Sequence, residues 1–398
     1  MAICCFWPLV TNSSFAQSWT PNCAPNKYWN RVISSADGNR LAAFSSTQIY
    51  TSTNSGTSWA SNNLPAGALS CVDAATSADG SVLVVGDLCG GIYTSTNSGK
   101  TWTTNNVPFG TWYAVASSAD GRKLVALSWF GNLFYISTNA GYTWTSSSPP
   151  CTNYFNGCAM ASSADGRKLA AAVTIQPAYP SYINQGWIYT STNFGVTWQI
   201  TSAPNTNWCS VASSADGNKL IAAAYDSMQI YSQSAVFMST NSGATWTALN
   251  MPGPLWGRIA IACSTNGNNL IVAPGNFPGC IYTSTDSGAT WITNNAPQTY
   301  WSSVASSADG CKLAAVTYPG LIYTWQYRPI IHLSSSSANQ SIFWASSPFA
   351  VGYELQQNSD LASTNWMTAG LPVNDDGTNM RVSISPLIRN TYFRLFHP

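Results

Sequence analysis

Short apolar segments alternate with polar turns along most of this chain, in a unit that recurs. One unit contains an apolar segment at 112–116, the turn Ser-Ala-Asp-Gly, and a second apolar segment at 123–128. A third segment, 133–136, leads into Ser-Thr-Asn-x-Gly-x-x-Trp, and a fourth begins at Trp144. Asp-Gly indicates a tight hairpin, because glycine adopts the positive φ that such a turn needs. The pattern predicts four antiparallel strands per unit and an all-β fold.

The spacing of the units indicates the architecture. The Ser-Ala-Asp-Gly turn, which we call the first turn, occurs seven times, with its glycine at Gly38, Gly80, Gly121, Gly166, Gly217, Gly267 and Gly310. The copy that ends at Gly267 is altered to Ser-Thr-Asn-Gly. A period of roughly 40–50 residues is the length of a four-stranded propeller blade. The second motif, which we call the box, begins at Ser52, Ser95, Ser137, Ser191, Ser239 and Ser284.

Seven turns but only six boxes suggest how the ring closes. The last unit stops at 321–325 without a fourth strand, and the N-terminal SWTPNCAPNKYW resembles TWTTNNVPFGTWY. Residues 18–20 are therefore expected to supply the missing strand, which leaves no open edge. The sequence predicts a seven-bladed β-propeller over residues 17–326, closed by its N-terminal strand.

Two further segments flank the repeats. Residues 1–16 are apolar and fit an export signal or an assembly tail, although no Lys or Arg precedes the apolar stretch. Short alternating segments between 330 and 396 predict a small fibronectin-like β-sandwich over residues 327–398. This segment resembles the C-terminal modules of secreted bacterial repeat proteins.

The box, S-T-N-x-G-x-T-W, resembles the Asp-box or BNR repeat, S-x-D-x-G-x-T-W, over roughly residues 15–326. That repeat occurs in sialidases, xyloglucan-cleaving propellers, the sortilin ectodomain and photosystem II assembly propellers. The resemblance implies a propeller and leaves function open, because the same repeat carries enzymes, receptors and assembly factors. Five of the six boxes have Asn at the family's Asp position, which keeps the acceptor and removes the charge. We interpret the box as a turn that satisfies its own hydrogen bonds.

Composition narrows the function. Only 7% of residues are charged and the net charge is +1, so no field attracts nucleic acid, and no apolar run is long enough to span a membrane. The first turns hold much of this charge, where we expect it to neutralise itself and to serve solubility. The repeats contain no Glu and no His, since Glu354, His332 and His397 lie beyond them. Sialidase chemistry is thereby excluded, and no motif for a metal or cofactor is present.

The two ends of the strands are expected to differ. The first turns and the boxes share one face of the ring, which we call the turn face; the remaining loops share the opposite, loop face. Aromatic side chains there suit stacking on sugars or packing against a protein. The candidates for binding are Trp129, Phe130, Tyr154, Phe155, Tyr179, Tyr182, Trp187, Tyr225, Trp256 and Phe277. The recurring Trp29, Trp112, Trp208 and Trp301 are expected in the blade core instead.

Cysteines and aspartates supply the remaining candidates. Eleven cysteines suggest an oxidising compartment, with one left unpaired, and topology suggests three disulfides: Cys71–Cys89, Cys151–Cys158 and Cys263–Cys311. Glycan cleavage by paired carboxylates would rest on Asp73, Asp87 or Asp226, for which hydrogen bonding to loop backbone is the structural alternative.

Three functions follow as hypotheses. The first is a non-catalytic extracellular or cell-surface protein that binds glycan or protein through the loop face, or acts as a scaffold. The second is a self-assembling subunit of an extracellular filament or surface layer, for which scarce charge and an odd cysteine would suit close packing. The third is a glycoside hydrolase.

Overall fold

The computed structural model describes residues 18–398 with gaps at 47, 66–67, 69, 89, 109, 130–132, 149–154, 176–184, 226–233, 276–277, 328–331, 336–339, 346–352, 360–364, 378, 385–391 and 397–398. The predicted tail, residues 1–16, lies outside the described residues. No helix occurs in the described ranges, and hence none that could cross a membrane. The chain divides into two compact units, Met1–Gln326 and Tyr327–Pro398.

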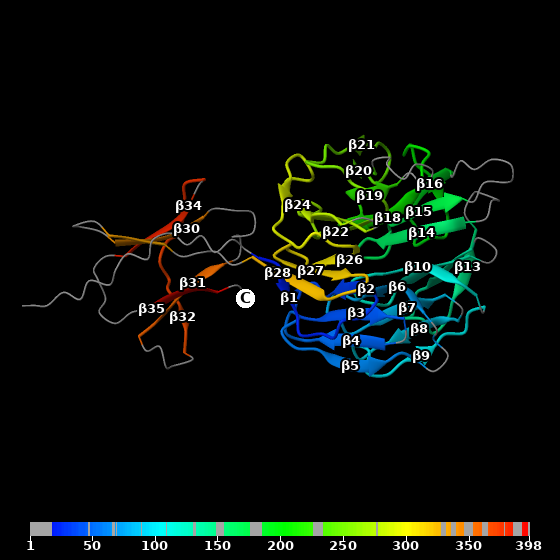
Figure 1. Ribbon diagram of the computed structural model, residues 1–398, viewed down its shortest axis with the longest axis horizontal. Coiled ribbons are helices and arrows are strands. Elements are labelled where there is room, and N and C mark those ends of the chain that lie inside the picture. Colours follow the sequence, from blue (N-terminus) through cyan, green and yellow to red (C-terminus); the bar gives the residue numbers. More distant parts are fainter. Residues whose placement is uncertain are drawn as a thin grey trace, which may run out of the picture. The chain divides into compact units, whose positions relative to one another are not determined.

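The described part of the first unit contains seven four-stranded antiparallel sheets (Figure 1). We number them sheets 1 to 7 in chain order of their first strands. The first strands are β2 (Trp29–Ser34), β6 (Cys71–Thr76), β10 (Trp112–Ser117), β14 (Phe155–Ser162), β18 (Trp208–Ser213), β22 (Ile259–Cys263) and β26 (Trp301–Ser306). The second strands are β3 (Leu41–Ser45), β7 (Leu83–Asp87), β11 (Leu124–Ser128), β15 (Leu169–Ile175), β19 (Leu220–Ala224), β23 (Leu270–Pro274) and β27 (Lys312–Thr317).

The outer half of each sheet completes it. The third strands are β4 (Gln48–Ser52), β8 (Ile92–Ser95), β12 (Phe134–Ser137), β16 (Gln185–Ser191), β20 (Ala235–Ser239), β24 (Tyr282–Ser284) and β28 (Ile322–Gln326). The fourth strands are β5 (Ala60–Asn63), β9 (Thr103–Thr104), β13 (Thr145–Ser147), β17 (Gln199–Ile200), β21 (Thr247–Ala248), β25 (Ile292–Thr293) and β1 (Thr20–Pro21).

Burial explains the composition of these strands. In sheets 1 to 6 every residue of the second strand is buried, because a neighbouring sheet covers each of its faces. Such strands read as continuous apolar runs rather than as an alternation. The predicted core tryptophans, Trp29, Trp112, Trp208 and Trp301, are all 0–1% exposed, which confirms their assignment. The fourth strands are short and largely exposed, which fits an outer edge that must resist pairing with other chains.

The sheets follow one another in a closed cycle. Each first strand contacts the first strand of the next sheet, and β26 of sheet 7 contacts β2 of sheet 1. Main-chain hydrogen bonds between the first turns repeat the cycle, each running from an amide to the next turn's carbonyl at 2.6–2.8 Å. Seven such bonds link Ala36, Ala78, Ala119, Ala164, Ala215, Thr265, Ala308 and again Ala36. A closed ring of main-chain hydrogen bonds therefore joins the seven first turns on the turn face.

The N-terminus enters sheet 7 as predicted, two residues further along the chain. Thr20 and Pro21 pair with Thr324 and Tyr323 of β28, and the Asn22 amide donates to the Ile322 carbonyl at 2.8 Å. Trp19, 6% exposed, packs against Trp301 with ring centroids 6.3 Å apart. Residues about 300 positions apart in sequence thus form one sheet.

The first turns correct our expectation about charge. Each turn aspartate accepts hydrogen bonds within its own turn, as Asp216 does from the Ser214 hydroxyl and the Asn218 amide. The basic residue two places after the turn glycine instead reaches the next sheet: Lys168 Nζ donates to Asn218 Oδ1 at 2.5 Å and to Ser242 Oγ at 3.1 Å. These cations therefore join neighbouring sheets, rather than serving solubility alone.

The boxes confirm the interpretation of a self-satisfied turn. In the third copy the Gly141 amide donates to Ser137 Oγ and the Thr143 amide to Asn139 Oδ1, both at 2.9 Å. Gly141 has φ of +92° and the preceding Ala140 +57°, so two consecutive residues are left-handed. Trp144 packs against the hydrophobic core between sheets 2 and 3.

The second unit contains two sheets. Strands β29 (His332–Ser335), β30 (Gln340–Ala345), β34 (Asn379–Ile384) and β33 (Asn374–Asp375) form one, in that order, and β32 (Met367–Thr368), β31 (Glu354–Asn358) and β35 (Tyr392–Phe396) the other. Ile342, Trp344 and Val382 of the first sheet and Leu355 of the second are buried. Strands β29, β30, β31, β34 and β35 lie in the region between 330 and 396 where alternation predicted short strands.

Candidate functional site

A cavity of about 570 Å³ lies where the first strands begin. Residues of all seven first strands line it, among them Arg31, Asp73, Tyr113, Ala159, Cys209, Ile259 and Trp301. Because consecutive first strands follow one another in a cycle, a cavity that touches all seven lies at the centre of the ring. It is at the end of the strands opposite the first turns, and hence on the loop face. We call it the axial cavity.

One ion pair lies in the cavity wall. Arg31 Nε of sheet 1 is 2.7 Å from Asp73 Oδ1 of sheet 2, with side chains 37% and 7% exposed. The two atoms are in ionic contact without the alignment of a hydrogen bond. Asp73 also accepts hydrogen bonds from the Ala74 amide at 2.9 Å and the Val115 amide at 3.0 Å. Burial raises the pKa of Asp73, and the Arg31 charge and these amides oppose that rise.

A second guanidinium, that of Arg258, lies exposed in the cavity lining. Within the described residues its side chain makes no ion pair or hydrogen bond. Asp73 compensates only one of the two arginines, so the described residues of the lining carry a net positive charge. A site of this kind favours an anionic group on a ligand.

Aromatic side chains form the rim. Tyr300 and Tyr318 line the cavity and are 44% and 50% exposed. Tyr318 packs against Tyr28 with ring centroids 5.1 Å apart, and Tyr113 of the lining packs against Trp129 at 6.4 Å. Exposed tyrosines beside an arginine are the side chains that most often dominate binding between proteins.

Two cysteine thiols in the lining are unreactive. Burial raises the pKa of Cys71 well above its ordinary value and that of Cys209 to about 11. The Cys209 thiol donates to the Ala223 carbonyl at 3.4 Å and accepts from the Ile259 amide at 3.4 Å. Both stay protonated at neutral pH, so neither is a nucleophile there.

Two of the three predicted catalytic aspartates, Asp73 and Asp87, accept hydrogen bonds from backbone amides. Asp73 and Asp87 lie on the paired strands β6 and β7, where Asp73 is opposite Gly86. Asp87 is fully buried and accepts from the Ser70 amide at 2.7 Å and the Leu88 amide at 2.8 Å. Each carboxylate thus holds its own set of backbone amides, the alternative that the sequence left open. Asp226 lies outside the described residues.

The predicted binding aromatics fall into three groups. Trp129 is 39% exposed at the rim of the axial cavity. Trp187, Tyr225 and Trp256 are half-buried, and Trp187 packs against the core between sheets 3 and 4 rather than facing solvent as a loop residue. Phe130, Tyr154, Tyr179, Tyr182 and Phe277 lie outside the described residues, as does the side chain of Phe155.

Sequence reasoning missed Tyr113, Tyr318 and Arg258 as site residues. A usable signal was present, because Tyr113 and Tyr300 are each adjacent to a recurring core tryptophan, Trp112 and Trp301. Successive side chains of a strand point to opposite sides. Positions next to such a tryptophan were therefore candidates for the axial cavity.

Two of the three predicted disulfides are not formed. Cys71 is a buried thiol whose Sγ lies 3.8 Å from the Asp73 carbonyl, and Cys263 is a thiol packed in the core of sheet 6. Cys71 packs in the core between sheets 1 and 2 and Cys263 against the core between sheets 5 and 6, which topology alone did not reveal. Cys89 and Cys151 and the side chain of Cys158 lie outside the described residues. No cluster of three metal-ligating side chains occurs in the described ranges.

Solved structures share this architecture. "YCF48 bound to D1 peptide" matches with a TM-score of 0.57 and 12% identity, covering 78% of this chain and 97% of that chain. "YCF48 from Cyanidioschyzon merolae" matches at 0.56 and 12%, covering 78% and 98%. "Kuenenia stuttgartiensis Hydrazine Synthase" matches at 0.56 and 13%, covering 74% and 94%. No family model and no curated protein matches the chain. The likeness shows the fold, so this is an all-β protein of the β-propeller class.

Proposed function

We propose that this chain is a non-catalytic binding protein whose axial cavity takes an acidic segment of another protein. The observation that carries the proposal is the joint presence of Arg258, without a partner among the described residues, and the exposed Tyr300 and Tyr318 in a cavity of about 570 Å³. Pockets of roughly 300–1,000 Å³ suit compact ligand groups, such as a few side chains of an inserted segment.

A solved neighbour supports a protein ligand. In the structure of YCF48 bound to D1 peptide, a propeller of the same architecture holds a peptide. The two chains share only 12% identity, so the ligand itself does not transfer. What supports an acidic segment here is the charge of this chain's own cavity.

The finer architecture belongs to the same proposal. We take the seven sheets and their closed cycle of turns to be seven blades of a degenerate Asp-box propeller, and the two sheets of residues 327–398 to be a small sandwich. An extracellular or cell-surface location is also part of the proposal, and rests on the eleven cysteines.

A peptide array with acidic, neutral and basic sequences tests the proposal. We expect acidic peptides to bind, and the double variant Arg258→Gln, Tyr300→Ala to weaken binding at least about tenfold, or about 1.4 kcal/mol. Tyr142→Ala is the matched control, because Tyr142 is 78% exposed in a box on the turn face. Preference for basic peptides, or equal loss in the control, would contradict the proposal.

The other functions predicted from sequence give different results with the same samples. A glycan-array signal that disappears in the Arg258→Gln, Tyr300→Ala variant would favour a glycan ligand over a protein. Concentration-dependent polymers in sedimentation would favour a filament or surface layer. Hydrolysis of a glycan that Asp73→Asn abolishes, in protein that remains folded, would favour the enzyme.

A further inference from the structure

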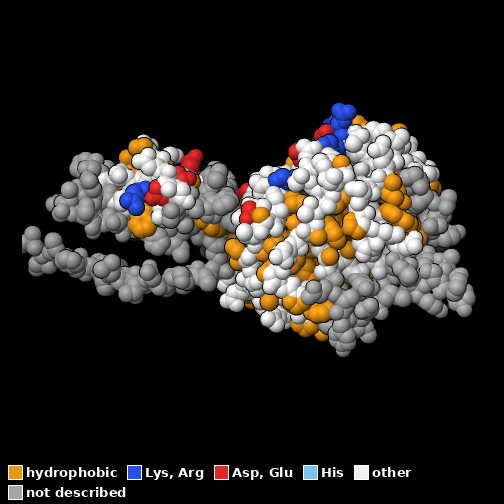
Figure 2. All heavy atoms as spheres, turned by 90° about the horizontal axis from the view of Figure 1, so that it is seen from above, with side chains coloured by type: hydrophobic (Ala, Val, Ile, Leu, Met, Phe, Trp, Pro, Cys, Tyr) orange, Lys and Arg blue, Asp and Glu red, His pale blue; other side chains and the backbone are white. Residues whose placement is uncertain are grey.

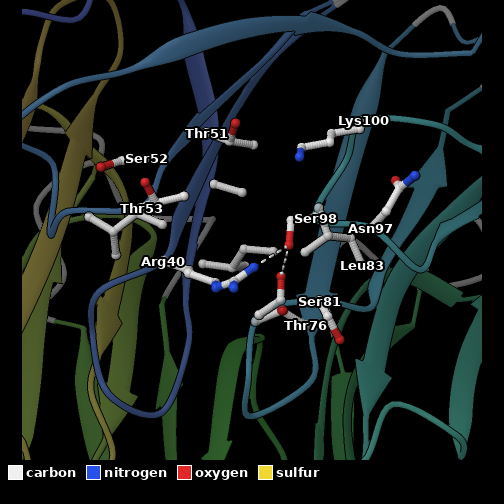
Figure 3. A pocket seen from close by; sticks show the side chains of 14 residues that line it. Arg40, Thr51, Ser52, Thr53, Thr76, Ser81, Leu83, Asn97, Ser98 and Lys100 are labelled. Atoms are coloured by element: carbon white, nitrogen blue, oxygen red, sulfur yellow. Dashed lines mark hydrogen bonds between the residues drawn. The ribbon is translucent and has the colours of Figure 1, made fainter.

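A second cavity, of about 340 Å³, lies on the turn face between sheets 1 and 2 (Figure 3). Ile33, Leu41 and Leu83 give it apolar walls, and Arg40 and Lys100 are its charged residues. No Asp or Glu lies in its lining. We call it the crevice; it is separate from the axial cavity and its function does not depend on that site.

Two of the corresponding crevices in the ring are closed. Those between sheets 3 and 4 and between sheets 4 and 5 hold about 10 Å³ each. Between sheets 3 and 4, Phe194 occupies the box position that Ser98 has in sheet 2, with φ of +61° and +59° respectively. The Lys123 ammonium lies 4.0 Å from the Phe194 ring centre, so ring and lysine fill the space together.

Sheet 1 is also packed less closely against the box of sheet 2 at this crevice. A Cβ atom placed on Gly243, in the box of sheet 5 beside the closed crevice between sheets 4 and 5, would lie 2.9 Å from Thr201 Cγ2 and 3.1 Å from Thr190 Cγ2 of sheet 4. The equivalent Gly99 instead has Ile49 and Leu83 as its nearest neighbours, at 3.1 and 3.2 Å. The threonine side chains that narrow the crevice between sheets 4 and 5 therefore have no equally close counterpart beside Gly99, and the space reaches down to apolar side chains.

The two cations differ in their partners. Arg40 donates to Ser98 Oγ at 2.8 Å, and its charge helps to lower the pKa of Asp79. Figure 3 shows the Lys100 side chain extending toward Thr51 across the crevice. The Lys100 ammonium has no hydrogen bond or ion pair in the part of the chain that the structure describes. The box of sheet 4 has Val196 in its place.

We propose that the crevice binds a small carboxylate with an apolar body, of about the size of an aromatic monocarboxylate. The carboxylate lies between Lys100 and Arg40, and the body lies against Ile33, Leu41 and Leu83. Two cations beside apolar walls, with no carboxylate in the lining, attract an anion that can also lie against those walls. The apolar body adds the free energy of burial, which a bare anion lacks.

Ligand-observed NMR titration of the full chain with benzoate tests the proposal, with benzyl alcohol and acetate as the two partial ligands. We expect saturable binding of benzoate and at least tenfold weaker binding of both others. If benzyl alcohol binds as well as benzoate, the cations do not contribute to binding. If acetate binds as well as benzoate, the apolar walls do not contribute. Absence of saturable benzoate binding would overturn the proposal outright.

Two variants locate the site, and the ring itself supplies their design. Ser98→Phe copies Phe194 and Lys100→Val copies Val196, so both side chains are already accommodated at the same backbone position in sheet 4. Each is expected to abolish benzoate binding, whereas Lys100→Arg should keep it. Ser242→Phe, the same change in the closed crevice between sheets 4 and 5, is the matched control. Binding that survives both Ser98→Phe and Lys100→Val would place benzoate elsewhere and refute the assignment.

Discussion

The turn face and the loop face are built from opposite ends of the same strands, but they differ in whether their polar side chains have partners within the protein. On the turn face, Asp216, Lys168 and their equivalents are bound by their own turn or by the next sheet. On the loop face, Arg258 and Tyr300 open into the axial cavity. Figure 2 shows how scarce charge is: on the face drawn, charged side chains of the first unit gather along one edge. What recurs in this chain therefore stabilises the ring, and what does not recur is available for ligands.

The crevice between sheets 1 and 2 sharpens that rule. It lies on the turn face, but Lys100 stands at a box position where no other box has a charged residue. The other boxes have Thr57, Tyr142, Val196, Ala244 and Ala289 there. Departure from the repeat, rather than the face as such, is what leaves side chains without partners. The following predictions test this division, from the largest expected effect to the smallest.

Removal of residues 1–22 should have the largest effect. It deletes β1 and the buried Trp19, and leaves β28 as an open edge. Loss of a buried tryptophan alone costs about 3–5 kcal/mol, so we expect thermal unfolding to begin roughly 10 °C lower. Removal of residues 1–17 is the control, because it keeps β1 in place. An unchanged Tm in the longer deletion would show that sheet 7 does not need the N-terminal strand.

Replacing Arg31 with Met should lower the stability of the protein by a smaller amount than the deletion does, and this loss should depend on pH. Asp73 is buried, and removing its partner leaves a carboxylate without its counter-charge, which costs about 2–3 kcal/mol at neutral pH. Burial already raises the pKa of Asp73, so the folded state holds this proton more tightly than the unfolded state. The loss should therefore grow as pH rises from about 4 to 7. Urea unfolding at both pH values checks this, and a loss independent of pH would rule out charge burial as its cause.

Gly217→Ala separates packing from backbone strain. Gly217 has φ of +67°, and an added Cβ would lie 2.7 Å from Lys168 Cβ of the preceding sheet. We expect Gly217→Ala to lower the free energy of unfolding by about 2–3 kcal/mol, of which the left-handed backbone alone accounts for about 1 kcal/mol. Gly370 has φ of +64° with nothing within 4 Å, so Gly370→Ala measures the backbone part alone, in the second unit. Equal losses in the two variants would show that the lysine stem moves aside freely.

Asp79→Asn should have the smallest effect, a loss of stability that is present above about pH 4 and disappears in acid. Hydrogen bonds from Ser77 and Ser81 lower the pKa of Asp79 to about 2, so its contribution is present above about pH 4 and disappears as pH falls towards 2. The variant should lose less stability than the parent between pH 4 and 2. The pKa shift of Asp79 is opposite in direction to that of Asp73, and the two losses therefore develop over different pH ranges. Parallel acid unfolding curves for the variant and the parent would contradict the expectation.

Several elements could be predicted closely, because short-range contacts determine them. The hydrogen bonds of the box run from Ser137 to Gly141 and from Asn139 to Thr143, each spanning four residues. The turn needs only Asp216, Ser214 and a left-handed Gly217. The missing fourth strand of sheet 7 followed from counting such motifs.

Other predictions failed where the outcome depends on distant residues. The disulfide proposed for Cys263 required knowledge of what packs on it, and its neighbours come from a separate sheet as well as its own. Trp187 was assigned to a loop because the segment before it is an insertion, but β15 and β16 extend to meet it and place it against the core.

The sequence by itself determined the repeat, the four strands of each unit, the tryptophans between sheets and the closure by residues near Thr20. Each of these depends on contacts within a few residues, or on a motif repeated so often that its role is unmistakable. Only the tertiary structure decided that Arg31 meets Asp73, that Lys168 reaches Ser242, and that Arg258 and Tyr300 share a cavity. Closing the ring brings the beginnings of seven strands to one axis, and no local pattern records which side chains meet there.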